Sequence, residues 1–270
     1  GGTEGIEIGF VTDMPSETSN YQNSLFPIAV TIKNKGEYPI KKSTVIAQIV
    51  GTFTDKNFVL SKTKSTTVQD LIPISQGLDA IEYDETTIDL GQAKYTAEMY
   101  APYISPDLKV DVCYPYKTIF KIDDLCIPTV SRLNEPEECT VDGTKNLVIA
   151  GSNSGAPVQI TTLREERQQN AVRVTMDITK VGDGKVIECV DNPESKDLNK
   201  VKVTINSDVQ CSFPDGTSGS TGIITLKSDN TQRLICEKAG VTGKSYLMNF
   251  EVALDYNFKQ SISKQIRINK

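Results

Sequence analysis

Cysteines and carboxylates are the residues of this chain that could do chemistry, and the chain has no histidine to assist them. The 270 residues include six cysteines and 35 acidic residues, but no histidine and no tryptophan. Without histidine, Ser-His-Asp and Cys-His nucleophilic sites and zinc-imidazole sites cannot form. Histidine is also the usual general base near neutral pH, so an enzyme would need carboxylate pairs, lysine or tyrosine. We therefore expect a protein that is not an enzyme and has no cofactor.

The cysteines predict disulfides. Their number is even and no two form a C-x-x-C pair, which disfavours zinc and thiol-redox motifs. Three disulfides made in an oxidising compartment explain six cysteines better, and buried free thiols are the alternative. Proximity in the sequence favours three pairs: Cys113 with Cys126, Cys139 with Cys189, and Cys211 with Cys236.

Acidic residues gather in the segments 123–124, 135–138 and 191–197. A glycosidase would need two carboxylates across a sugar cleft, whereas solvated loop charge is the interpretation that we favour. Clustered carboxylates can also bind calcium, although the chain has no D-x-[DN]-x-[DN]-G loop. The weak calcium candidates are Asp191, Glu194 and Asp197, with residues 135–138 as a second placement.

Charge limits the partners. The net charge is -6 and the isoelectric point is near 5.0. A nucleic-acid partner is not expected, because it would need a basic stripe. No run of Lys or Arg suits an acidic membrane surface, and no apolar stretch approaches the length of a membrane span, so we expect no direct membrane insertion of this segment. Because the sequence does not begin with Met, we expect that an upstream segment was removed, in the cell or otherwise.

Strand-like alternation of apolar and polar residues dominates the chain. Examples are FPIAVTIKNKG (26–36), LKVDVCYPYK (108–117), NAVRVTMDITK (170–180) and FEVALDYNFK (250–259). Turn signals such as Lys35-Gly36 and Asp183-Gly184 separate such segments. Many short strands between regular turn signals predict an all-β fold of the sandwich type.

The chain also repeats itself. Residues 108–117 match 250–259 in their apolar positions, and residues 28–40 match 174–186 in the same order. We therefore predict two tandem immunoglobulin-like β-sandwiches, residues 1–126 and 141–270. The Pro-containing segment 127–140 would be the linker, and a loop inside one large β-domain is the alternative.

One turn carries a family resemblance. Asn34, Lys35 and Gly36 follow the strand FPIAVTIKNKG, which resembles the CARDB type of immunoglobulin-like domain. The whole chain resembles a family of secreted surface proteins from small archaea, through GTEGIEIGF, IKNKGEY, CYPYKT, GAPVQIT and SISKQIRI. The second copy departs from the turn pattern, with Thr179-Lys180-Val181-Gly182 (179–182) in place of the Asn. The resemblance implies the fold and a surface location, and it implies no chemistry.

The tyrosines allow two interpretations. Tyrosine suits interfaces, because it buries a large area at a low entropic cost, and it also packs the ends of sandwiches. The residues concerned are Tyr83, Tyr95, Tyr100, Tyr103, Tyr114 and Tyr116.

The first strand suggests a function. Ile6, Ile8 and Phe10 alternate with Glu7 and Gly9, and a neighbouring subunit could take up such a strand. The equally plausible alternative is that it is the first strand of its own module, like residues 156–163 in the second copy. We expect a non-catalytic extracellular subunit of a filament, pilus-like fibre or sheath that self-associates into a homopolymer or surface array. The alternatives are a membrane-anchored adhesion or spacer ectodomain, a virion surface protein, and, third, an enzyme or carbohydrate-binding module.

Overall fold

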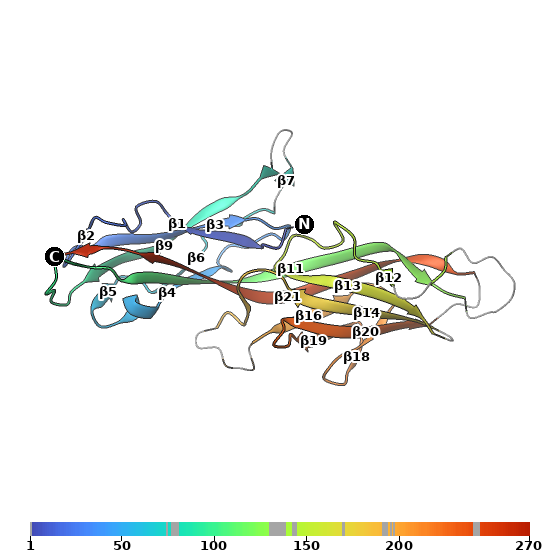
Figure 1. Ribbon diagram of the computed structural model, residues 1–270. Coiled ribbons are helices and arrows are strands. Elements are labelled where there is room, and N and C mark those ends of the chain that lie inside the picture. Colours follow the sequence, from blue (N-terminus) through green and yellow to red (C-terminus); the bar gives the residue numbers. More distant parts are fainter. Residues whose placement is uncertain are drawn as a thin grey trace. The chain divides into compact units, whose positions relative to one another are not determined.

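The computed structural model confirms the all-β class (Figure 1). It describes residues 2–73, 75–76, 81–129, 139–141, 145–168, 171–190, 194, 196, 198–239 and 244–270. Strands form most of these residues, and a 3-10 turn, η1 (Gly51–Thr54), follows β4. No helix among the described residues is long and apolar enough to cross a membrane.

Contacts between residues divide the chain into two compact units. Unit 1 consists of Gly1–Thr3 and Tyr116–Tyr256, and unit 2 consists of Glu4–Pro115 and Asn257–Lys270. This division differs from the expected one at 127–140. Both boundaries fall inside long strands, β11 (Asp107–Ile127) and β21 (Tyr246–Gln265), so each strand contributes residues to both units. Uninterrupted alternation in a sequence gives no sign of such a boundary.

Unit 2 is built from two larger sheets and two small ones. The first sheet has the antiparallel order β1-β3-β9-β5, and the second joins the first part of β11 to β4 and β6. Their bounds are β1 (Ile6–Phe10), β3 (Phe26–Asn34), β4 (Ile46–Val50), β5 (Phe58–Leu60), β6 (Lys64–Thr66) and β9 (Glu85–Tyr95). The small sheets use β2 (Asn20–Tyr21), β7 (Ser75–Gln76), β8 (Ile81–Glu82), β10 (Tyr103–Ile104) and β22 (Ile268–Asn269).

The core of unit 2 follows from the alternation in these strands. Ile28, Val30 and Ile32 of β3 are fully buried, and so are Val110 and Val112 of β11. Successive side chains of a strand point to opposite faces, so each second residue enters the core between the sheets. The remaining residues of β3 and β11 are then free to be polar.

Unit 1 has a corresponding pair of sheets. One has the order β12-β13-β14-β20-β17-β18, and the other joins the first part of β21 to β16 and β19, with β15 also paired to β21. Their bounds are β12 (Lys145–Asn146), β13 (Val158–Arg167), β14 (Ala171–Lys180), β15 (Lys185–Val186), β16 (Lys200–Ile205), β17 (Gln210–Ser212), β18 (Ser218–Gly219), β19 (Thr221–Thr225) and β20 (Thr231–Ala239).

Strand pairing confirms the predicted match between residues 108–117 and 250–259. In unit 2, Val110 lies opposite Ile49 of β4. In unit 1, its predicted counterpart Val252 lies opposite Ile205 of β16. The closing strand comes last in the sequence of unit 2 (residues 257–265) and first in that of unit 1 (residues 116–127), while the other strands of the two larger sheets follow in corresponding order. The order β1-β3-β9-β5 matches the A-B-E-D order of an immunoglobulin sheet.

The first strand belongs to the chain's own unit 2. β1 lies beside β3 (Figure 1). Ile8 lies opposite Ile32 in this pair, and Ile6 is fully buried. Within this chain the strand therefore pairs inside its own module, as the alternative interpretation expects, and a contact of Ile6, Ile8 and Phe10 with a neighbouring subunit stays a prediction. β1 is thus the edge strand of this sheet, with β3 between it and β9.

Candidate functional site

A strand from the far end of the sequence closes the second sheet of unit 2. Residues 257–265, the last part of β21, lie beside the first part of β11. The Asp111 carboxylate accepts a 2.6 Å hydrogen bond from Ser261 Oγ and lies 3.3 Å from Lys259 Nζ. Tyr114 Oη donates to Gln260 Oε1 at 3.0 Å. Charge and hydrogen-bond complementarity therefore fix the register of this strand.

Main-chain contacts then hold the residues that follow it. Ile266 N donates to Pro106 O at 3.1 Å, and Lys270 N donates to Pro102 O at 2.9 Å. Between them, β22 pairs antiparallel with β10 and parallel with β2, and its Ile268 is fully buried. Asn20, only 3% exposed, donates through Nδ2 to Arg267 O at 3.0 Å. Residues 257–270 are thus bound along their length.

The corresponding strand of unit 1 is the later part of β11, residues 116–127. Thr118 Oγ1 donates to Val158 O at 2.6 Å and forms a 3.1 Å hydrogen bond with Tyr256 Oη. That hydroxyl oxygen also accepts from Val158 N at 3.2 Å. Burial raises the pKa of Tyr256, so the phenol stays neutral. This buried network joins β11, β13 and β21 within unit 1.

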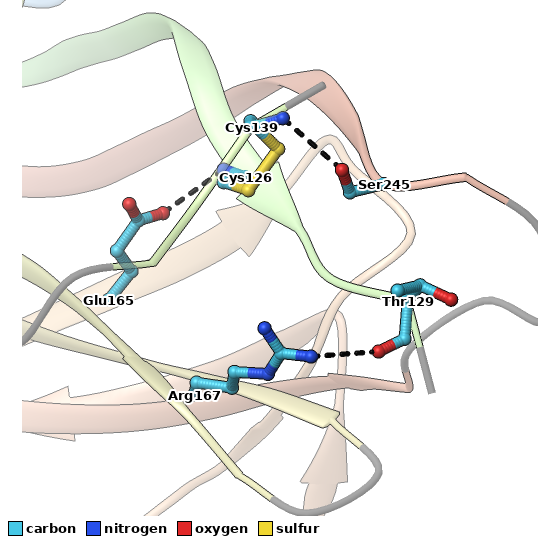
Figure 2. Close-up of a disulfide and its surroundings, with 6 residues drawn as sticks. All are labelled: Cys126, Thr129, Cys139, Glu165, Arg167 and Ser245. Atoms are coloured by element: carbon cyan, nitrogen blue, oxygen red, sulfur yellow. Dashed lines mark hydrogen bonds between the residues drawn. A yellow bond between two sulfur atoms is a disulfide. The ribbon is translucent and has the colours of Figure 1, made fainter. Parts of the chain in front are cut away.

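A disulfide fixes the end of the same strand (Figure 2). Cys126 is bonded to Cys139, and Cys126 N donates to Glu165 Oε2 at 3.0 Å. Glu165 is 6% exposed, and a main-chain N–H is one of the groups that compensates the cost of burying its carboxylate. Cys139 N donates to Ser245 Oγ at 3.2 Å. Both cysteines are therefore held by hydrogen bonds as well as by the covalent bridge.

The observed disulfides correct two of the three predicted pairs. All six cysteines are disulfide-bonded, so the free-thiol alternative is wrong. Cys113 and Cys126 lie on the same strand, β11, where 13 residues span roughly 40 Å at about 3.3 Å per residue, so they cannot bridge. The pairs of Cys113 with Cys126 and of Cys139 with Cys189 are wrong. The third pair, Cys211 with Cys236, is confirmed and joins β17 to β20.

Gly2 and Thr3 are held by unit 1. Gly2 O accepts hydrogen bonds from Ala156 N at 3.1 Å and from Gln159 Nε2 at 2.9 Å. A Cβ at Gly182 would lie 2.8 Å from Thr3 O and 2.6 Å from Pro157 Cβ. Glycine is therefore required at residue 182 to let the chain pass.

The outer face of the β13-β14-β20 sheet carries a polar hollow of about 190 Å³. Its centre is Asp177, whose carboxylate pairs with Arg233 Nε at 2.8 Å and accepts from Thr162 Oγ1 at 2.7 Å. The Arg233 hydrogen bond, with help from Thr162, lowers the pKa of Asp177. The arrangement is an ion pair on a sheet surface, and its groups are satisfied by one another.

The calcium candidates are not brought together in the part of the chain that the structure describes. Asp191, Asp197 and residues 135–138 lie outside the described residues. The Glu194 carboxylate lies 3.1 Å from Lys196 Nζ. Among the described residues, no group of three or more His, Cys, Asp or Glu side chains could hold a metal ion.

The tyrosines divide between the two interpretations. Tyr114 is buried in the strand contact described above, Tyr116 is buried and donates through Oη to Gly155 O at 3.0 Å, and Tyr95 packs edge-on against Phe58. Tyr100 is 89% exposed, and Tyr103 lies under the Arg267 guanidinium at 3.9 Å. Packing therefore explains the first three, while Tyr100 is available to a partner.

Sequence reasoning missed the residues that hold the two closing strands. Thr118 and Asn20 look like ordinary strand and loop residues, and nothing in their spacing marks them. Tyr256 did carry a signal, because it is the repeat counterpart of Tyr114. A tyrosine kept on the buried face of both copies is a residue whose hydroxyl needs a partner inside the protein.

Comparisons with known proteins give little. No family model matches the sequence, and no curated protein matches it. Among solved structures, the chain is similar to one in "Life in the extremes: atomic structure of Sulfolobus Turreted Icosahedral Virus". The identity is 9%, the match covers 86% of this chain and 83% of that chain, and the TM-score is 0.14. A likeness at that TM-score carries no argument about fold or function.

Proposed function

We propose that this chain is a non-catalytic extracellular structural subunit that self-associates into a cell-surface assembly such as a filament, pilus-like fibre or sheath. In this proposal each unit is a CARDB-like, immunoglobulin-like sandwich. The observation that carries it is the closing strand of unit 2, residues 257–270, which comes from a remote part of the sequence, whereas the closing strand of unit 1, residues 116–127, is continuous with the rest of that unit.

Such closure supports a mechanical role. A strand that lies along a sheet is pulled out by shear, so that its hydrogen bonds must break together rather than one after another. In unit 2 these bonds extend from Asp111 to the contacts of Ile266 and Lys270. In unit 1 the bridge from Cys126 to Cys139 adds a covalent bond at the strand end. A subunit under tension needs this kind of resistance.

The disulfides support the extracellular part of the proposal. All six cysteines are bonded, and bridges of this number persist in oxidising compartments such as the cell exterior. The bridge from Cys211 to Cys236 closes a 25-residue separation and the bridge from Cys126 to Cys139 a 13-residue one. Both constrain the unfolded chain and so favour a fold that must survive outside the cell.

The test is the concentration dependence of assembly. The oxidised chain is examined by sedimentation velocity over a wide range of concentrations and by negative-stain electron microscopy. We expect polymers of regular width that increase with concentration. Monomers at every concentration would contradict the proposal and favour an anchored spacer ectodomain, and closed shells would favour a virion component. The reduced protein is the control, because polymers that need reduction would be misfolded aggregates.

A further inference from the structure

We propose that the assembly forms by strand exchange, with residues 257–270 of one copy taking the place of the same residues in unit 2 of another copy. The inference rests on the proposed function and names the contact that would join the subunits. It replaces the first strand of the chain, Ile6–Phe10, by the last part of β21 as the strand that is exchanged.

The first step is that residues 257–270 have the buried apolar side chains and the polar contacts by which a strand binds to a sheet. Phe258, Ile266 and Ile268 are buried to 1% exposure or less, so this segment supplies apolar side chains to the core of unit 2. Lys259 adds an ion pair with Asp111. In strand addition, main-chain hydrogen bonds give affinity and alternate side chains give specificity, and this segment has both.

The second step is that unit 2 has a matching place for it. Phe258 meets the Tyr114 ring at a centroid distance of 6.0 Å in an edge-on contact. Lys264 donates to Pro15 O at 3.0 Å and pairs with Glu17 at 3.7 Å. These partners all lie within residues 4–115, which are continuous in sequence. The segment that they bind follows residue 256, after the chain has passed through unit 1.

The third step concerns covalent ties. Residues 257–270 contain no cysteine, so they can leave unit 2 without breaking a disulfide of their own. Residues 116–127 cannot leave unit 1 in this way, because Cys126 is bridged to Cys139. Strand β1 is a poor candidate for another reason: β3, its partner, follows it in the same unit at close sequence distance. Of these three segments, residues 257–270 are the one that combines sequence remoteness with freedom from a covalent tie.

The fourth step identifies the partner. A second copy of the chain presents an identical segment and an identical place for it, so the exchanged contacts equal the internal ones. Exchange of identical elements between copies is an inexpensive route to association, and head-to-tail exchange that does not close gives a fibre. High local concentration then favours exchange over internal closure by mass action.

The experiment traps the exchanged contact in full-length chains. Because Ser261 Oγ and Asp111 Oδ1 are 2.6 Å apart, cysteines at these two positions suit a disulfide. One chain carries Ser261→Cys and a second, with a different tag, carries Asp111→Cys. They are mixed at polymerising concentration under mild oxidation. We expect a covalent heterodimer with the 261–111 bond identified by peptide mass spectrometry, formed at least tenfold faster than in a control mixture of Ser261→Cys with Thr54→Cys.

Two further readouts separate the possible failures. The double variant Asp111→Cys/Ser261→Cys, kept dilute, should form the same bond inside one chain. Polymers without the heterodimer, when the dilute double variant does bridge, would overturn strand exchange and leave the structural role standing. Absence of both polymers and heterodimer would overturn the two proposals together. A double variant that never bridges would contradict the position of residues 257–270 and so overturn strand exchange as well.

Discussion

The two units fasten the same pair of strands in different ways. In unit 1, β17 lies beside β20, and Cys211 is directly opposite Cys236 and bonded to it. In unit 2, β5 lies beside β9, and Phe58 is opposite Tyr95 with the rings 5.1 Å apart, edge to face. Equivalent strands at the same position of the sheet therefore depend on a covalent bond in one unit and on aromatic packing in the other.

Unit 2 extends the aromatic contact into a cluster. Phe53, on the 3-10 turn η1, stacks on Phe58 with centroids 4.2 Å apart and meets Phe26 edge-on at 6.4 Å. Phe53 is fully buried, so the turn inserts its one large apolar side chain into the core. A short strand such as β5 offers few main-chain hydrogen bonds, and its side chains must supply the remaining stability. The comparison shows that a buried aromatic cluster in unit 2 takes the place that a disulfide has at the corresponding strands of unit 1.

The largest effect is expected in unit 2. Phe53→Ala removes the ring that links β3 to β5 and leaves a cavity, which should lower the free energy of unfolding by about 3–5 kcal/mol. Hydrogen–deuterium exchange should show faster exchange in β5 and β9 and unchanged exchange in β17 and β20. Phe53→Leu, the control, should lose less than half as much. Equal acceleration in both units would contradict the view that the cluster acts locally.

The matched change in unit 1 should be slightly smaller. The double variant Cys211→Ala/Cys236→Ala opens a loop of 25 residues, for which the chain-entropy model gives a loss of about 3.5 kcal/mol. Urea unfolding followed by circular dichroism measures it, and exchange should now accelerate in β17 and β20 alone. If Phe53→Ala and this variant destabilise the same strands, the aromatic cluster and the disulfide do not stabilise their units separately.

The comparison also shows how far the sequence reaches. Alternation in residues 28–32 and 174–178 identifies the buried faces of β3 and β14, because burial alone fixes that pattern. The Asn-Lys-Gly turn was recognised too, and Asn34 is fully buried with Nδ2 donating to Tyr38 O and to Ile72 O, both at 2.9 Å. Short polar side chains that satisfy the main chain of a turn leave a recognisable motif.

Partners of strands are harder to predict than their faces. The alternation of β11 continues from Val110 to Phe120 whichever unit the residues join, so it gave no hint of the division after Pro115. The same limit explains the disulfides. Proximity in the sequence pairs Cys211 with Cys236 correctly, because β17 and β20 also lie side by side. The same rule wrongly pairs Cys126 with Cys113, because both lie on β11 and too far apart to bridge. Thr118 became visible as a site residue only after β11, β13 and β21 were placed together.

The smallest effect that we expect is a dependence of stability on pH, which comes from Asp177. Asp177 on β14 is held ionised by Arg233, whereas its repeat counterpart in unit 2 is Thr31, which donates to Gly9 O at 3.3 Å and has no charge. The Arg233 hydrogen bond lowers the pKa of Asp177 in the folded state. The resulting stability is therefore complete above the unfolded pKa, about 3.9, and is lost as pH falls through the lower folded value.

Asp177→Asn should accordingly cost about 1 kcal/mol at pH 7, the upper range for an exposed ion pair, and almost nothing near pH 2. Urea unfolding of the wild type and the variant at both pH values measures the difference. Thr31→Val on the corresponding strand of unit 2 is the control, and its cost should not change with pH. A cost of Asp177→Asn that persists undiminished in acid would mean that shape and the hydrogen bond from Thr162, rather than the charge of Asp177, fix this face.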